Sequence, residues 1–423
     1  MTRPFTYFDA LYGDVTLSSV LGDLAQTPAV QRLRDIRLSN IDSLSMPGIA
    51  NISRFEHALG SSFLATSINR GSHMTDDDSM TLAATAMLHD AAITGFGHLV
   101  EEALQYADTG FDHEEKLNAL LFVPDKAHLG GLDLQIYQGR QAGLYGWAER
   151  CFGNSASERI VDITQGLHGI GRWGQYISSD VDLDNLDNLV RIAYHMGLPV
   201  DRELPLRIAR GMTPAPTSGA PVFAESAVSL IEQWLALRHA VYARLMLSRS
   251  DFVGKSMLLF AVITAYQDGD LGLRQQAWTL TDRSLLNALA ASRNPEVSRT
   301  LQSWLTQELW PLGDLLWFDG APPPFPKVMS FCDVASTSVD RMCFAYRIND
   351  KRVRRITLNT ETRNAVEMGT APTQWLLGIS SRKREPFTRS ENDQLRELAS
   401  EFFNSRCLGL ARTSEPEPAR LFG

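Results

Sequence analysis

Apolar residues recur at intervals of three and four along most of the first two thirds of the chain, which is the spacing of amphipathic helices. This pattern predicts helices over about residues 29–39, 55–69, 80–90, 180–197, 223–247, 251–267 and 282–308. Another helix is expected to begin near Gly97. Thr27 and Pro28 suit the N-cap and the first position of the first of these helices. Residues 211–221 are rich in Gly, Pro, Ser and Thr and predict an exposed loop.

The pattern changes after a Pro-rich stretch at 321–326. Strand-like segments follow at 342–348, 353–358 and 374–380, with Asn349–Asp350 as a turn between the first two. Residues 390–404 have helical spacing, and residues 411–423 have the composition of a flexible tail. The sequence therefore predicts a mainly α chain with a helical domain over 1–320, a small α+β domain over 327–410 and the tail.

Composition narrows the class of protein. The chain has 423 residues, of which 44% are hydrophobic and 21% charged, proportions that are ordinary for a soluble globular protein. A net charge of −9 argues against non-specific nucleic-acid binding as the main role, although a local basic site is compatible with it. None of the four cysteines (Cys151, Cys332, Cys343 and Cys407) has the spacing of a zinc ribbon, so we expect reduced thiols.

The distribution of apolar residues also indicates where in the cell the protein is expected. No run of about 18 apolar residues is present, so a membrane span is not expected. The N-terminal residues lack the apolar core of a secretory signal. We therefore expect a cytoplasmic protein.

Histidine and acidic residues form four groups along the helical part. The groups are Arg54-Phe55-Glu56-His57, His89-Asp90, His98 with Glu101, and Asp184. A mixed set of His and Asp ligands suits a divalent cation such as Mn, Mg, Fe, Co, Ni or Zn. Such an ion lowers the pKa of bound water and binds phosphoryl oxygens. A lone histidine is more often structural, and this is our expectation for His73, His128, His168 and His239.

These groups belong to an ordered series of motifs between about residues 5 and 310. The motifs are YFDALYGDV at 7–15, TPAVQRLRDI at 27–36, RFEHALG at 54–60, MLHD at 87–90, FGHLVEEAL at 96–104, HE at 113–114, DLDNLD at 182–187 and YHMG at 194–197. The series resembles the HD-domain metal-dependent phosphohydrolase superfamily, in particular its dNTP triphosphohydrolase (dGTPase-like) branch. The resemblance implies an HD-domain helical core in which one divalent ion, shared or not with a second, is held by His57, His89, Asp90 and Asp184.

His98 and Glu101 are three residues apart and share one face of a helix. A carboxylate beside an imidazole raises its pKa and orients it, which suits proton transfer to a leaving oxygen or positioning of water. The alternative is a first-turn Glu that stabilises the helix dipole beside an N-terminal His. His113 and Glu114 match another pair of the family and would complete a proton relay, or else form a surface pair at a helix start.

Several residues are candidates for substrate contacts. Arg54 lies three residues before His57 and could bind phosphate through its guanidinium, or pair with a nearby acid. Arg191 and Arg238 occupy family-like positions, and either could instead be structural. Asn185 and Asn188 stand where the family carries a basic residue and a Tyr that packs on the sugar.

Other positions also depart from the family. Ile192 replaces an Asp that holds the 3′-hydroxyl, Met246 and Ser248 replace a Tyr and a His, and Ile93 replaces a polar residue after the His-Asp pair. A site without its hydroxyl acceptor loses discrimination for that hydroxyl. The metal ligands are therefore all present, while recognition of the deoxyribose is altered.

The favoured function is a dNTP triphosphohydrolase, in which water attacks the α-phosphorus and deoxynucleoside and triphosphate leave. One alternative is a phosphohydrolase with the same metal-dependent chemistry whose substrate is a nucleoside monophosphate, a modified nucleotide or a signalling nucleotide. Another is a nucleotide-binding regulatory protein with a vestigial site, whose segment after residue 327 would be the partner surface. By analogy with the family, we also expect a homo-oligomer and allow for an allosteric nucleotide.

Overall fold

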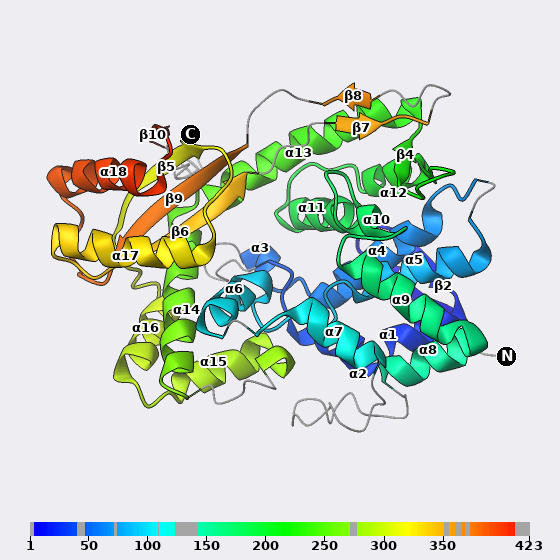
Figure 1. Ribbon diagram of the computed structural model, residues 1–423, viewed down its shortest axis with the longest axis horizontal. Coiled ribbons are helices and arrows are strands. Elements are labelled where there is room, and N and C mark those ends of the chain that lie inside the picture. Colours follow the sequence, from blue (N-terminus) through cyan, green and yellow to red (C-terminus); the bar gives the residue numbers. More distant parts are fainter. Residues whose placement is uncertain are drawn as a thin grey trace, which may run out of the picture.

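The protein is mainly helical, with a small α+β part at its C-terminal side (Figure 1). The structure is a computed structural model that describes residues 4–39, 47–71, 74–108, 110–122, 143–270, 277–350, 355–359, 365–368 and 373–410. His73, His128 and the predicted tail lie outside these ranges. Over the described ranges, no helix has both the length and the apolar character that crossing a bilayer requires.

The chain opens with an antiparallel hairpin of β1 (Phe5–Asp9) and β2 (Gly13–Leu17). The Asp9 carboxylate accepts hydrogen bonds from two backbone N–H groups of the connecting turn. Three short helices follow: α1 (Ser19–Ala25), α2 (Pro28–Gln31) and the 3₁₀ helix η1 (Arg32–Asp35). The helix predicted over 29–39 therefore ends early, because Ile36 adopts extended backbone angles and ends the turn.

The central helices are close to those that the apolar spacing predicts. They are α4 (Arg54–Ser67), α5 (Asp76–Leu88), α6 (Gly97–Ala107) and α11 (Leu183–His195). Side chains at the N-caps of three of them accept a backbone hydrogen bond from the first turn: Ser53 for α4, Thr75 for α5 and Asp182 for α11.

Helices that the pattern did not predict fill the space around this group. They are α3 (Pro47–Ala50), α7 (His113–Phe122), α8 (Leu144–Phe152), α9 (Ala156–Leu167), α10 (Gly174–Ile177) and α12 (Leu204–Arg210). The exposed loop predicted at 211–221 is shorter than expected, because its residues Met212–Pro214 form β3, which pairs with β4 (Pro221–Phe223), and Met212 and Ala215 are buried.

The next helices are long. They are α13 (Val228–Met246), preceded by η5 (Glu225–Ala227), and α14 (Arg249–Gln267). Most of the stretch predicted to be helical at 282–308 is helical, in two helices: after η6 (Ala277–Thr279) the chain forms α15 (Asp282–Ala290) and α16 (Pro295–Leu305). Pro295 has no backbone N–H to continue the first helix, and the Asn294 side chain caps the second.

A four-stranded antiparallel sheet forms the core of the α+β part. Its order is β10 (Cys407–Leu410), β5 (Leu312–Asp319), β9 (Gln374–Ser381), β6 (Cys343–Asp350). Two helices, α17 (Phe325–Val339) and α18 (Arg389–Phe403), accompany it (Figure 1). Because β5 precedes the Pro-rich stretch, the sheet begins earlier in the chain than the predicted boundary at 321–326. The division into domains stays a prediction.

One prediction for this part is wrong, and another is confirmed over a shorter range. Asn349 and Asp350 were expected to form a turn, but both pair with β9 as the end of β6. The strand expected at 353–358 appears as β7 (Arg355–Thr357), which pairs with β8 (Ala365–Glu367) in a separate two-stranded sheet. This sheet lies beside β4, where Leu358 bridges Phe223 (Figure 1).

Buried apolar side chains form two clusters. The first core includes residues of α4, α5 and α11, and the second includes residues of α14, α16, α17, α18 and the four-stranded sheet. Helix α6 belongs to the second core through Leu99, Val100, Ala103 and Leu104. The start of α6 therefore meets the helices of the first core where the His and Asp residues gather.

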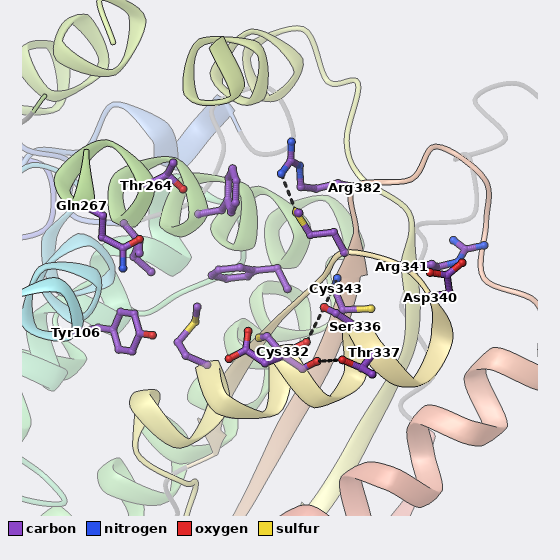
Figure 2. A pocket seen from close by; sticks show the side chains of 16 residues that line it. Tyr106, Thr264, Gln267, Cys332, Ser336, Thr337, Asp340, Arg341, Cys343 and Arg382 are labelled. Carbon is purple, nitrogen blue, oxygen red and sulfur yellow. Dashed lines mark hydrogen bonds between the residues drawn. The ribbon is translucent and has the colours of Figure 1, made fainter. Parts of the chain in front are cut away.

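A cavity of about 710 Å³ lies between two helices of the helical part, α6 and α14, and the α17 and β6 elements of the α+β part. Figure 2 shows Tyr106, Gln267 and Thr264 on one side of it and Arg382 on another. The Arg382 guanidinium is already paired with Glu296. The residues that line this cavity include none of the predicted site residues.

Candidate metal centre

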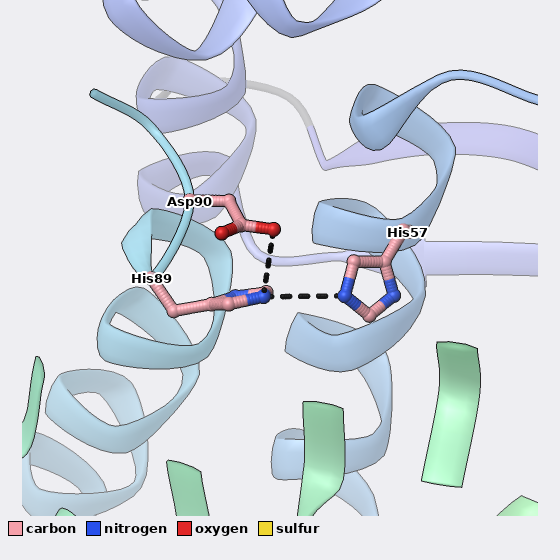
Figure 3. A group of neighbouring side chains, drawn as sticks. All are labelled: His57, His89 and Asp90. Carbon is pink, nitrogen blue, oxygen red and sulfur yellow. Dashed lines mark hydrogen bonds and ion pairs between the residues drawn. The ribbon is translucent and has the colours of Figure 1, made fainter. Parts of the chain in front are cut away.

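The four predicted metal ligands converge at one point. The Nε2 atoms of His57 and His89 are 3.2 Å apart. Asp184 Oδ1 lies 2.9 Å from His57 Nε2 and 3.6 Å from His89 Nε2. Asp90 Oδ2 lies 3.3 Å from His89 Nε2. Figure 3 shows the ring edges of the two histidines facing one another, with the Asp90 carboxylate above His89.

Local structure explains why residues so far apart in sequence meet. His57 is in the first turn of α4 and is completely buried, while His89 is the C-cap residue of α5. The chain turns directly after His89, which lets Asp90 face the same space. Asp184 lies in the first turn of α11, which Asp182 caps through a 2.7 Å bond from the Asn185 N–H. Three element ends thus present the four side chains.

The tautomers of both histidines leave Nε2 available. His57 Nδ1 lies 2.8 Å from Asp187 Oδ2, and His89 Nδ1 lies 2.8 Å from the Ala86 carbonyl oxygen. Both partners accept hydrogen bonds, so Nδ1 carries the proton in each neutral ring. The two Nε2 lone pairs then point at one another and at two carboxylates, an arrangement that a cation would stabilise.

The donor set fits a divalent cation. Ligand atoms bound at ~2.0–2.2 Å in tetrahedral or octahedral geometry are roughly 3.0–3.5 Å apart. The distances between the two Nε2 atoms, from both of them to Asp184, and from His89 to Asp90 run from 2.9 to 3.6 Å. The Nδ1 bonds of both rings also match the outer contacts that usually fix metal-binding histidines. Nitrogen and carboxylate ligands together suit Mn, Fe, Co, Ni or Zn better than a purely oxygen-binding ion.

The charges of the cluster favour metal binding. Burial alone would raise the pKa of Asp90, but Arg54 and His89 hold it well below its usual value. Hydrogen bonds from His57 and His89 likewise outweigh the loss of hydration at the partly exposed Asp184 and lower its pKa. Both carboxylates are therefore ionised at neutral pH. Burial lowers the pKa of His57 and of His89, yet the surrounding carboxylates outweigh it and raise both, so a binding cation displaces protons there.

A second group lies directly beside the first. Glu101 joins two imidazoles: its Oε2 is 2.9 Å from His98 Nδ1, and its Oε1 is 2.6 Å from His113 Nδ1. On its other side, His98 Nε2 lies 3.5 Å from Asp90 Oδ1. The His98 side chain is 58% exposed, whereas Glu101 and His113 are buried. The predicted His98, Glu101 and His113 thus form one chain that begins at Asp90, a candidate metal ligand, and has its first ring open to solvent.

The pKa values in this second group follow from its hydrogen bonds. Burial raises the pKa of Glu101, but its two imidazole partners lower it to about 2. Loss of hydration lowers the pKa of His98, while hydrogen bonds with Asp90 and Glu101 outweigh this and raise it to about 9. Glu101 is therefore an ionised acceptor that orients both rings.

Comparison with solved structures shows a protein with the same fold as this chain. No protein-family model matches the chain. A crystal structure of a phosphohydrolase (BT4208) from Bacteroides thetaiotaomicron aligns with a TM-score of 0.63 and 16% identity, covering 90% of this chain and 100% of that one. The two proteins share a fold.

Three curated proteins are similar in sequence, and all three carry the name "uncharacterized". MJ1154 of Methanocaldococcus jannaschii is 27% identical over 289 residues, which are 68% of this chain and 55% of that protein. YwfO of Bacillus subtilis is 27% identical over 231 residues (53% and 47%), and MG461 of Mycoplasma genitalium is 26% identical over 247 residues (56% and 55%). The chain spans about half the length of these relatives.

Other predicted site residues have different partners. Arg54 is buried and pairs with Asp90, the salt bridge that was the alternative to a phosphate contact. Glu114 does not extend the chain from His113, because its carboxylate lies 2.5 Å from Nδ1 of His168. His168, expected to be structural, therefore has a specific acidic partner.

The remaining substrate candidates are spread over two helices. The Asn185 amide bonds back to the capping Asp182, and the buried amide oxygen of Asn188 has no hydrogen-bond partner within the described residues. Arg191 is completely buried and pairs with Asp187 and Asp9. Arg238 lies on α13, where its guanidinium stacks 4.3 Å over the Tyr242 ring. For these residues, direct substrate contact stays a prediction.

The sequence analysis missed a buried set of residues behind His57. Asp187 accepts the His57 Nδ1–H, and Tyr12 OH donates to Asp187 at 2.8 Å. A signal was present: Asp187 lies three residues after Asp184 and four before Arg191, so all three share one region of the helix surface. Tyr12 lies in the opening motif, but nothing local in the sequence shows that its hydroxyl reaches α11.

Proposed function

We propose that the protein is a metal-dependent phosphohydrolase of the HD type that acts on a nucleotide. One observation carries the proposal: the Nε2 atoms of His57 and His89 lie 3.2 Å apart, and each lies within 3.6 Å of the Asp184 carboxylate, with Asp90 3.3 Å from His89 and a His-Glu-His chain beside them. The ordered motifs and the fold shared with a phosphohydrolase support it.

Each residue of the site has a proposed role in the reaction. His57, His89, Asp90 and Asp184 would hold a divalent cation, which lowers the pKa of bound water and polarises a phosphoryl oxygen. Arg54 holds the Asp90 carboxylate in place. His98, exposed and within 3.5 Å of Asp90, is placed to exchange a proton with the reacting water or the leaving oxygen. Glu101 orients His98, and His113 fixes Glu101 from the other side.

A nucleotide is the proposed substrate, and hydrolysis of a dNTP at the α-phosphorus is the version that the motifs favour. Two features favour the alternative of another nucleotide. Ile192, at the position of the family's sugar-binding Asp, is buried in the first core and offers no acceptor. Arg54 and Arg191, two candidates for substrate contacts, are buried in ion pairs with acidic residues. A homo-oligomer, an allosteric nucleotide and a cytoplasmic location also remain proposals.

The test combines metal analysis with a substrate panel. The protein is loaded with Mn, Mg, Fe, Co, Ni or Zn and incubated with dNTPs, NTPs, monophosphates and signalling nucleotides, and the products are separated by chromatography. We expect about one tightly bound transition metal per chain and cleavage of at least one nucleotide class. Release of nucleoside and triphosphate would identify attack at the α-phosphorus.

His89→Ala and His239→Ala make a matched pair of variants. His89 is in the cluster, whereas His239 is exposed on α13. His89→Ala should lose the metal and the cleavage with an unchanged circular dichroism spectrum, and His239→Ala should behave as wild type. A wild-type protein that takes up no metal and cleaves nothing would instead support the binding-protein alternative.

A further inference from the structure

A buried polar network connects His57 to the N-terminal hairpin. The completely buried Asp187 carboxylate accepts four hydrogen bonds. Its Oδ2 takes the His57 Nδ1–H at 2.8 Å and the Arg191 Nε–H at 2.9 Å. Its Oδ1 takes the Tyr12 hydroxyl at 2.8 Å and the Arg191 Nη2–H at 2.9 Å. With every bond made, the carboxylate has little freedom to rotate, and neither has the imidazole that it holds.

The network continues into the turn of the hairpin. Arg191 Nη2 pairs with Asp9 Oδ2 at 3.1 Å. Asp9 Oδ1 accepts the backbone N–H groups of Leu11 at 2.8 Å and Tyr12 at 3.2 Å. The same carboxylate therefore shapes the turn and anchors it to α11. The hairpin reaches His57 by two routes, one through the Tyr12 hydroxyl and one through Asp9 and Arg191.

Helix α4 packs against this network without a gap. A Cβ atom added to Gly60, one turn after His57, would overlap the Asp187 carboxylate and the Arg191 guanidinium. The Tyr12 ring also packs against Phe63 of α4, with ring centroids 5.2 Å apart. Displacement of Tyr12 or Asp187 is therefore transmitted to the helix that carries His57.

From these contacts we propose that the end of the hairpin at Asp9–Tyr12 is an outer part of the metal centre. Tyr12 acts as a positioning residue: its hydroxyl fixes Asp187, and Asp187 fixes the tautomer and direction of His57. This inference rests on the proposed metal site. Outer hydrogen-bond partners of metal-binding histidines typically contribute about 10–100-fold in metal affinity. By thermodynamic linkage, a bound cation in turn stabilises the docked hairpin.

The chain offers a matched pair of tyrosines for the test. Tyr7 and Tyr12 belong to the same hairpin motif, and within the described residues the buried Tyr7 hydroxyl has no hydrogen-bond partner. Tyr12→Phe and Tyr7→Phe remove the same atom, but only the first breaks a bond to Asp187. Cobalt(II) is the probe, and its affinity is measured by competition with a chromogenic chelator. Its visible absorption spectrum reports the ligand geometry.

Tyr12→Phe should weaken cobalt binding about ten-fold and alter the cobalt spectrum, while Tyr7→Phe leaves both unchanged. In wild type, cobalt should slow hydrogen exchange at the turn amides of Leu11 and Tyr12 more than at the distant β3–β4 hairpin. Unchanged affinity and spectrum in Tyr12→Phe would overturn the inference while the metal site stands. If Tyr12→Phe does not fold, the wild-type exchange result decides. A wild type that binds no cobalt contradicts the proposed function itself.

Discussion

Asp90 uses its two oxygens for different partners. Oδ2 faces Arg54 and His89, whereas Oδ1 faces His98. A single carboxylate therefore connects the metal ligands with the His98–Glu101–His113 chain. Because Glu101 holds two imidazoles while buried, its ionised form contributes to folding as well as to orientation.

The pH dependence of stability should reveal this contribution. The pKa of Glu101 is lowered to about 2 in the folded protein, against about 4.3 in an unfolded chain. A carboxylate whose pKa is lower in the folded protein stabilises the fold at pH values above its pKa in the unfolded chain. This stabilisation is lost as the pH falls through the pKa of the folded protein. Glu101 then contributes roughly 3 kcal/mol at pH 6 and about half of that at pH 3.

Urea unfolding of wild type and Glu101→Gln at both pH values measures this difference. The variant should be less stable at pH 6, and the gap should narrow toward pH 3. Glu114→Gln, in the partly exposed pair with His168, serves as the control with a small effect. A gap between wild type and Glu101→Gln that is independent of pH would show that the ionised carboxylate is not what stabilises the fold.

The start of α6 depends on an unusual backbone. Phe96 and Gly97 both have positive φ, of 60° and 59°, so the chain turns sharply before the helix that carries His98. A Cβ atom on Gly97 would overlap the Arg54 guanidinium, which itself pairs with Asp90. Glycine is therefore needed at this turn for two reasons, backbone conformation and close approach.

Gly97→Ala should consequently damage the site as well as the fold. We expect a loss of about 1–3 kcal/mol and weaker metal binding, because Arg54 and Asp90 must shift. Gly153 is the control: its φ is 53°, and an added Cβ meets nothing within 4 Å. Gly153→Ala should cost the backbone strain alone, about 1 kcal/mol, and keep its metal affinity. Equal metal affinities in the two variants would contradict this view of the turn.

Periodicity predicted the helices that carry the ligands, because α4, α5 and α11 are amphipathic or rich in apolar residues and have clear N-caps. It did not separate α15 from α16, although Pro295 at the start of α16 is a local signal. It also did not predict that β7 lies near β4, because that position depends on contacts between residues far apart in the chain. The motif resemblance supplied His57, His89, Asp90 and Asp184. It could not supply Tyr12, whose role depends on a contact across 175 residues.

The two cores divide the site between them. The helices that present the four candidate metal ligands pack in the first core, whereas α6, which carries His98 and Glu101, packs on α14 in the second. An ion pair between Glu102 of α6 and Arg347 of β6, 2.7 Å long, also ties α6 to the sheet. Metal affinity should therefore depend mainly on the first core, and the placement of His98 on the second.

Thermal unfolding with and without a divalent cation tests this division. A ligand that binds only the folded state stabilises it by about 2.7 kcal/mol at a concentration 100 times its Kd. Cobalt or manganese should therefore raise the Tm of wild type, and His89→Ala should show no rise.

Gly378→Ala would place a Cβ against the Phe252 ring of α14 and disturb the second core. Its Tm should fall, as overpacking typically costs about 1–3 kcal/mol. The rise with cation should persist because all four ligands lie elsewhere, and its loss in Gly378→Ala would mean that the two cores form the metal site together.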